Sequence, residues 1–293
     1  MISIKKLIED FDGFGKSITV PHSQKLTGGY KVNISKYSGL VSVIKRRSSK
    51  VIADEWSKKI FGKKFSRSTY TAKVPAVIAR QKYVLETLIA QLKLKNKSLC
   101  DLGAGEGDFL NMLKKKNLTK NIFAVEPSIK NCNLITKNKI NNFCGTIESF
   151  ANKKSVKQFD ILTMMWTLCN TSNANDIINS ANKLCKKNGH LLIAESSRIL
   201  VPYKKPIQMY FSKKNPDLHP FHFSKNSLCN LLVLNKFKLV YVNRYIDSDS
   251  LVVIARKINC IEKEKLKLDD YNKVKNFFSS WYNDSKKYKS ELL

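Results

Sequence analysis

Short apolar runs alternate with amphipathic stretches through the middle of the chain. The runs have the length of buried strands, and the stretches between them carry apolar residues at three- and four-residue spacing, which is typical of helices. Strands are predicted at 98–102, 121–125, 143–144, 159–165 and 190–195, and helices at 107–116, 128–138 and 173–187. Strands that alternate with helices in this way indicate a parallel sheet with helices on both faces.

The pattern changes in the last part of the predicted sheet. A helix is expected from Ser224, a favourable N-cap residue, to about Asn235. Two further strands, 237–243 and 251–256, are joined by turn-forming residues at 247–249, which indicates a hairpin. The predicted fold is therefore α/β, with a doubly wound, seven-stranded, mostly parallel sheet closed by an antiparallel hairpin.

The segments on either side of this core have different patterns. Residues 28–44 are rich in Gly and Tyr and are expected to be irregular or extended. Helices are predicted from Ser48 through Trp56 and from Pro75 to about Leu92, because Pro is favourable at the first helical position. Aromatic residues at helical spacing predict a helical segment at 262–293, packed on the core. We expect an N-terminal basic cap at 1–97, the core domain at 98–257 and a C-terminal helical extension at 258–293.

A Gly-rich turn after the first predicted strand reads DLGAGEG over residues 101–107. Gly103 and Gly105 allow a tight turn and a close approach of the backbone to a ligand, and the following helix offers free N–H groups. Glu126 ends the second strand, 23 residues after Gly103, where a solvent-facing carboxylate can accept hydrogen bonds from both hydroxyls of a ribose. Asp101 either contacts the ligand or caps the amides of its own loop.

The G-x-G-x-G form of this turn, the acid two residues before it and the closing hairpin together resemble the class I S-adenosylmethionine-dependent methyltransferases. The resemblance covers about 98–257 and implies a Rossmann-like core with S-adenosylmethionine as its cofactor. It implies that the glycine loop holds the methionine part, Glu126 the ribose, and Thr146 and Ile147 the adenine. The family often has Asp where Thr146 stands, which leaves Ile147 to pack on the ring and offer its N–H. The implied cofactor-binding residues are Asp101, Gly103, Ala104, Gly105, Glu126, Pro127, Thr146, Ile147, Met165 and Trp166, the last two near the reactive methyl group.

Candidates for an acceptor-binding group or a general base lie in the long connection 196–223. His222 and His219 are the candidate catalytic residues there, and a structural role in packing or hydrogen bonding is the alternative for both. Glu195, at the end of the fifth strand, is a further pocket candidate. His190 begins that strand at the opposite end and is not expected to act in catalysis, and Glu148 is expected to cap a turn.

Two sequence motifs are absent, and their absence restricts the class of acceptor. The fourth strand ends in TMMWT, at 163–167, without the [DNS]-P-P-[YF] motif of enzymes that methylate exocyclic amines of bases. Cys169 follows without the Pro-Cys context of cytosine-C5 enzymes. The pattern of the fourth strand and the FHFS entry into a helix at 221–224 are similar to the small-molecule branch of the family, which includes sugar and surface-polysaccharide enzymes.

The net charge of +30 points towards an anionic partner, but its composition weakens that inference. Lys supplies most of the positive charge, and Lys, Asn and Ile share A/T-rich codons, whereas Arg is the expected residue for bidentate phosphate contacts. Residues 1–97 carry 21 basic and 6 acidic groups, a net charge of +15. We therefore expect Lys45, Arg46 and Arg47, with Tyr30 and Tyr37, to attract an anionic acceptor, and a solvated flank before a helix is the alternative. His22 belongs to the same basic segment, but the sequence does not place it.

The seven cysteines are scattered and include no C-x-x-C pair, so neither a disulfide framework nor a metal site is expected. They are interpreted as reduced thiols of a cytoplasmic protein. Apolar runs are too short to span a bilayer, and Glu9, Asp10 and Asp12 interrupt the stretch that an export signal requires.

These observations lead to one preferred function. We expect a methyltransferase that uses S-adenosylmethionine to methylate a small anionic metabolite, such as a nucleotide-linked sugar or a polysaccharide precursor, by in-line transfer. An RNA methyltransferase that uses the basic N-terminal region is the alternative enzyme. A subunit that binds S-adenosylmethionine without catalysis is the alternative from another class.

Overall fold

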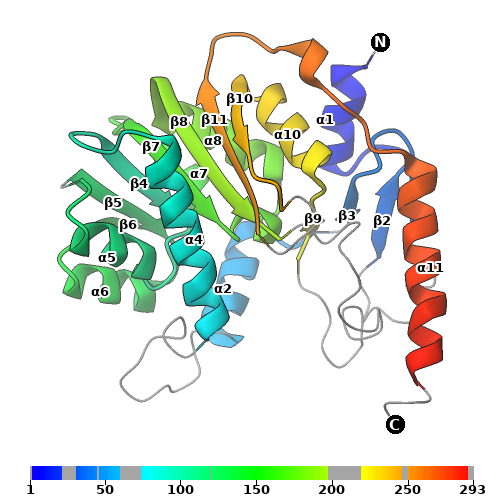
Figure 1. Cartoon of the computed structure of the whole chain (residues 1–293), viewed down its shortest axis with the longest axis horizontal. Coiled ribbons are helices and arrows are strands. Elements are labelled where there is room, and N and C mark those ends of the chain that lie inside the picture. The colour runs from blue at the N-terminus through cyan, green and yellow to red at the C-terminus, as the bar shows by residue number, and fades with distance from the viewer. Residues whose placement is uncertain are drawn as a thin grey trace.

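A seven-stranded mixed sheet forms the centre of the molecule, in the order β10-β11-β8-β7-β4-β5-β6 (Figure 1). Its strands are β4 (Ser98–Leu102), β5 (Asn121–Glu126), β6 (Asn141–Cys144), β7 (Phe159–Met165), β8 (Cys185–Glu195), β10 (Phe237–Val242) and β11 (Leu251–Lys257). The computed structural model describes residues 2–21, 31–44, 46–59, 74–119, 121–196, 219–245 and 250–289. The strands β8, β7, β4, β5 and β6 are parallel, and β11 and β10 are antiparallel to their neighbours. The predicted α/β fold with a closing hairpin is confirmed.

Helices cover both faces of this sheet, as Figure 1 shows. One layer contains α4 (Pro75–Gln91), α5 (Asp108–Lys115) and α6 (Ile129–Lys137), and the other contains α7 (Ile147–Ala151), α8 (Ala174–Leu184) and α10 (Lys225–Leu234). Leu88 of α4, Leu110 of α5 and Ile135 of α6 pack with the strand residues Leu99 and Ile161 in one buried cluster. Burial of large aliphatic side chains, worth about 1.5–3 kcal/mol each, therefore stabilises both layers.

The helix predicted at 173–187 is too long, because α8 ends at Leu184 and Cys185 already begins β8. Phe159 pairs with Cys185 but Ile161 pairs with His190, so the chain between Cys185 and His190 forms a bulge in the parallel pair. Asn188 has a φ of 58° in this bulge, a conformation that Asn tolerates better than most residues. The last residues of the predicted helix, 185–187, therefore belong to a strand instead.

A second sheet, of order β1-β2-β3-β9, was not predicted. Its strands are β1 (Ser17–Thr19), β2 (Val32–Ser35), β3 (Val41–Val43) and β9 (Phe221–His222). The described part of 28–44 is extended, as expected, but it is also paired. The sheet is completed by β9, which pairs antiparallel with β3 from a distant part of the sequence.

The C-terminal helix α11 (Tyr271–Lys289) lies beside this second sheet at the right of Figure 1. Val274 and Phe278 of α11 are buried in one cluster with Val32 and Ile34 of β2. The helix begins later than predicted, because 263–265 form only a single 3-10 turn, η3 (Lys263–Lys265). Two further helices, α1 (Ile4–Asp12) and α2 (Ser49–Lys59), belong to the N-terminal part. Among the helices that the structure describes, none is long and apolar enough to cross a membrane.

Candidate functional site

The sequence motifs meet at one edge of the large sheet. The parallel strands β4, β5 and β7 end at Leu102, Glu126 and Met165, and β5 and β7 are the two neighbours of β4. Ligands of open α/β sheets bind outside the carboxyl ends of the strands, where the connecting loops turn back. This edge therefore is the candidate site.

The loop after β4 is held close to β5 by its own backbone. Gly103 and Ala104 both donate to the carbonyl oxygen of Val125, at 2.8 and 3.1 Å. Gly103 has a φ of +80°, and a Cβ built there would come within 2.4 Å of the Thr167 hydroxyl oxygen. Both the backbone conformation and the close approach of Thr167 require glycine at this position.

Glu126 is more deeply buried than the sequence suggested. It was expected to face solvent, but it is only 5% exposed. Its Oε2 accepts from the Gly105 N–H at 2.9 Å, and its Oε1 accepts from the Ser128 N–H at 3.0 Å and the Asn131 amide at 3.3 Å. Burial raises the pKa of Glu126 to about 7. The carboxylate thus joins the glycine loop to the start of α6.

Asp101 is buried behind the same loop. Its Oδ1 accepts from the Thr163 hydroxyl at 2.7 Å, and its Oδ2 has no hydrogen-bond partner among the residues that the structure describes. Neither oxygen accepts from an amide of the loop among the described residues, so the alternative that Asp101 caps its own loop finds no support. Burial, with a smaller contribution from Glu126, raises the pKa of Asp101 to about 7. A buried acceptor oxygen beside a glycine loop fits a site that a polar ligand completes.

The two raised pKa values predict a pH-dependent stability. The carboxyl of Glu126 titrates near 4.5 when unfolded and near 7 when folded, so its ionisation disfavours the folded state as pH rises between these values. The full effect is on the order of 3 kcal/mol, and Asp101 adds an effect of the same sign. We expect the free energy of unfolding of Glu126→Gln, relative to wild type, to rise between pH 5 and pH 8 in urea titrations. Parallel pH profiles of the two proteins would contradict the raised pKa.

The segment expected to flank the adenine is the start of α7. Thr146 caps this helix by accepting from the Ser149 N–H at 3.2 Å, and Ile147 is buried at its first position. The prediction that Glu148 caps a turn is wrong, because Thr146 has that role and Glu148 accepts from the hydroxyl of Ser49 at 3.1 Å. Ser49 begins α2, so this contact ties the N-terminal part of the chain to the candidate site.

The end of β7 supplies the expected wall near the methyl group. Met165 and Trp166 are both partly buried, and Trp166 has an unusual φ of 50° while its N–H donates to Ala194 at 2.7 Å. Arg80 of α4 lies over the Trp166 ring, with its Cζ 4.7 Å from the ring centroid. Sequence analysis missed Arg80, although it is one of only a few arginines in a Lys-rich chain.

The candidate bases lie in and beside the second sheet. His222 is buried in β9, which packs against the 3-10 turn η2 (Leu168–Asn170). His219 is partly buried, and most of the predicted 196–223 connection before it lies outside the described residues. Glu195 is fully buried and accepts from the backbone N–H groups of Leu168 and Cys169, at 2.7 and 3.2 Å, so it positions η2.

Two of the residues that were expected to attract an anionic acceptor, Arg46 and Tyr37, make structural contacts instead. The Arg46 guanidinium donates to the carbonyl oxygens of Val43 and Phe11 at 2.6 and 2.7 Å and lies over the Phe221 ring. Burial lowers the pKa of Arg46 to about 10. The hydroxyl of Tyr37 accepts from the N–H of Ser3. Both side chains thus connect the second sheet with α1 rather than facing solvent, and Lys45, Tyr30 and His22 lie outside the described residues.

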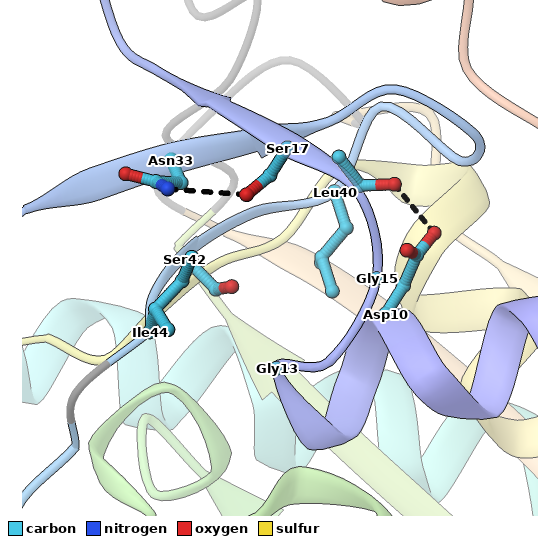
Figure 2. A pocket seen from close by; sticks show the side chains of 9 residues that line it. Asp10, Gly13, Gly15, Ser17, Asn33, Leu40, Ser42 and Ile44 are labelled. Carbon is cyan, nitrogen blue, oxygen red and sulfur yellow. Dashed lines mark hydrogen bonds between the residues drawn. The ribbon is translucent and has the colours of Figure 1, made fainter.

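A small hollow lies between the end of α1 and the second sheet (Figure 2). Polar side chains line it, and they bond to one another. Asn33 donates to Ser17 at 3.1 Å and Ser35 donates to Asp10 at 2.5 Å. The first pair joins β2 to β1 and the second joins β2 to α1, and none of the predicted cofactor residues lines the hollow.

Comparisons with known proteins agree with this geometry. A family model described as a methyltransferase domain matches residues 77–242. Comparison with curated proteins finds no match.

Several solved structures share the fold. A magnesium protoporphyrin IX methyltransferase from Synechocystis PCC 6803, with bound S-adenosylhomocysteine, is 13% identical with a TM-score of 0.53, over 72% of this chain and 99% of that one. A 1,6-didemethyltoxoflavin-N1-methyltransferase from Burkholderia thailandensis is 14% identical with a TM-score of 0.52, over 77% and 98%. The [4+2]-cyclase SpnF is 13% identical with a TM-score of 0.51, over 72% and 97%.

At these identities the solved structures establish the fold alone, and the family model carries the assignment. That model spans more than half of the chain and includes the glycine loop, Glu126 and Trp166. The chain belongs to the methyltransferase-domain family, as a class I S-adenosylmethionine-dependent methyltransferase.

Proposed function

We propose that this enzyme transfers the methyl group of S-adenosylmethionine to a small anionic acceptor that lies between α4 and the carboxyl end of β7. The position of Arg80 supports an anionic acceptor. Its guanidinium lies 4.7 Å from the Trp166 ring centroid, and its Nε is buried without a hydrogen-bond partner among the described residues. A buried N–H without an acceptor is costly, and carboxylate and phosphate oxygens match the guanidinium well.

The candidate site contains the groups that this reaction requires. When bound, the cofactor supplies a methyl group made electrophilic by a sulfonium. The glycine loop at 103–105 would lie against its methionine part, and Glu126 would accept from its ribose hydroxyls. The unpartnered Oδ2 of Asp101 is a further acceptor behind the loop. Met165 and Trp166 would exclude water and align the acceptor, which is the main task in an in-line transfer.

The need for a base depends on the acceptor atom. A carboxylate acceptor is already deprotonated, whereas a hydroxyl must lose a proton during transfer. His222 is our candidate base for a hydroxyl acceptor, because β9 packs against η2, which follows Trp166 along the chain. His219 is the second candidate, three residues before it.

Arg80→Gln is expected to lower kcat/KM for the acceptor by about 10- to 100-fold, the effect of losing a hydrogen bond to a charged group. The acceptor is found by incubating the anionic fraction of a metabolite extract with methyl-labelled S-adenosylmethionine and identifying the labelled product. Nucleotide-linked sugars and polysaccharide precursors belong to that fraction. The control is Arg256→Gln, since Arg256 is the register partner of His190, in the middle of β8 and away from its carboxyl end at Glu195.

Calorimetry distinguishes a role of Arg80 in binding the acceptor from a role in binding the cofactor. Unchanged affinity of Arg80→Gln for S-adenosylhomocysteine supports a role in acceptor binding. Weaker binding of S-adenosylhomocysteine, with unchanged binding of 5′-methylthioadenosine, assigns Arg80 to the cofactor's carboxylate and removes the argument for an anionic acceptor. Label incorporated into RNA, with binding that weakens steeply as salt rises, overturns the small-molecule proposal in favour of an RNA substrate.

A further inference from the structure

Two cysteines meet behind Glu126, on the side away from the glycine loop. Cys144 ends β6 and is the register partner of Glu126 at the end of β5. Cys132 of α6 donates from its Sγ to the Glu126 carbonyl oxygen at 3.1 Å, and Gly145 donates its N–H to the same oxygen at 3.0 Å. Neighbouring strands lie about 4.8 Å apart, so both cysteines lie against one peptide group.

The two thiols differ in access. Cys144 is exposed, whereas Cys132 is only 4% exposed. The Cys144 side chain lies close enough to Cys132 that, together with burial, it raises the pKa of the Cys132 thiol well above its usual range. None of the seven cysteines forms a disulfide in the part of the chain that the structure describes, which contains them all, and Cys260 is the other exposed one. Cys144 is thus the thiol that an oxidant reaches first, and Cys132 is positioned to react with it.

We propose that Cys132 and Cys144 are an oxidation-sensitive dithiol, and that their disulfide weakens cofactor binding at Glu126. The oxidant is a peroxide. The Cys144 thiolate attacks one peroxide oxygen, the O–O bond breaks, and water leaves after protonation, which makes a sulfenic acid. The Cys132 sulfur then attacks the Cys144 sulfur, and the sulfenic oxygen leaves as a second water. Two thiols and one hydrogen peroxide thereby give one disulfide and two waters, and the two sulfurs supply the two electrons that the peroxide gains.

The disulfide acts on the site through α6. It removes the S–H donor from the Glu126 carbonyl and ties α6 to the end of β6. The N–H of Ser128, just before α6, and the amide of Asn131 within it both donate to the Glu126 carboxylate. A shift of this segment therefore disturbs the carboxylate proposed to hold the ribose. This consequence rests on the proposed cofactor position, whereas formation of the disulfide does not.

The test oxidises the full-length protein with hydrogen peroxide and measures two quantities. Mass spectrometry of unreduced peptides detects the link between Cys132 and Cys144, and calorimetry measures the affinity for S-adenosylhomocysteine. We expect the link in wild type and in the matched control Cys260→Ser, with affinity reduced about three- to tenfold, as for one lost hydrogen bond, and restored by dithiothreitol. Cys144→Ser, a change at an exposed position, should form no link and keep its affinity under the same treatment.

Three outcomes would overturn the proposal or part of it. Oxidation of Cys144 to sulfinic acid without a link to Cys132 excludes the dithiol. A complete link with unchanged affinity excludes its effect on the cofactor. An equal loss of affinity in oxidised Cys144→Ser assigns the effect to another residue. Absence of binding in the reduced protein, by contrast, contradicts the proposed cofactor site and leaves the measured link as the test of the dithiol.

Discussion

Glu126→Ala is expected to weaken binding of S-adenosylhomocysteine by at least about 100-fold. The wild-type carboxylate is proposed to accept two ribose hydroxyls, and hydrogen bonds to a charged group contribute about 1.5–3 kcal/mol each. The variant also leaves the N–H groups of Gly105 and Ser128, which are 2.9 and 3.0 Å from the carboxylate in wild type, without their acceptor. Calorimetry at pH 8 measures the affinity with the wild-type group ionised.

Two further variants separate the ribose role from a general loss of structure. Glu126→Gln keeps the side-chain volume and one acceptor oxygen, so its affinity should fall between those of wild type and Glu126→Ala. Glu148→Gln changes a carboxylate that accepts from Ser49 at 3.1 Å, near the proposed adenine segment, and should bind as wild type does. Wild-type affinity in a folded Glu126→Ala protein would remove Glu126 from the cofactor site.

Gly103→Ala is expected to abolish detectable cofactor binding and to destabilise the fold by about 3 kcal/mol or more. A φ of +80° costs an L-residue roughly 1–2 kcal/mol, and the new Cβ would lie 2.4 and 2.5 Å from the Thr167 side chain. Both effects push the loop away from β7, and with it the N–H of Gly105 that donates to Glu126. Urea unfolding measures the stability, and calorimetry measures the affinity.

A matched control isolates the backbone conformation from the collision. Gly13→Ala has a similar φ of +87°, but its Cβ would come no closer than 3.4 Å to Arg46, so only the conformational cost remains. Adding Thr167→Gly to Gly103→Ala removes the colliding atoms and should restore part of the stability. If Gly103→Ala is no less stable than Gly13→Ala, or if it retains its affinity for the cofactor, the close approach of Thr167 is unimportant.

The large sheet was predictable because its signals are local. A buried strand such as Ser98–Leu102 is a short apolar run, and α5 follows it at once with apolar residues on one face. Such periodicity requires no knowledge of distant residues. The second sheet was not predictable in the same way, since β9 contains only two residues and its partner β3 lies far back in the chain.

The sequence predicted which residues lie at the candidate site, but it did not predict what surrounds their side chains. Asp101, Gly103 and Glu126 meet at one sheet edge, as their places at strand ends implied. The burial of Glu126, the contact of Asp101 with Thr163 and the position of Arg80 over Trp166 join segments that are far apart in sequence. No spacing rule relates such segments.

The roles of the basic residues were also not predictable from their positions in the sequence. The basic cluster at 45–47 was expected to attract an anionic acceptor, but Arg46 is partly buried, lies over the Phe221 ring and donates to backbone carbonyls. Arg80, outside any cluster, is the arginine that lies at the candidate site. A guanidinium can stack on a ring and donate in several directions, so its role depends on what surrounds it more than on neighbouring charges in the sequence.

The sequence by itself determined the strands of the large sheet, the glycine loop and the acid at the end of β5, because these features depend on local periodicity and backbone freedom. Only the tertiary structure decided which side chains are buried, which arginine lies beside Trp166, and which two cysteines share the peptide of Glu126. Burial and proximity arise when strands distant in the chain pair and pack. The chemistry of this site therefore depends on contacts that a linear pattern does not contain.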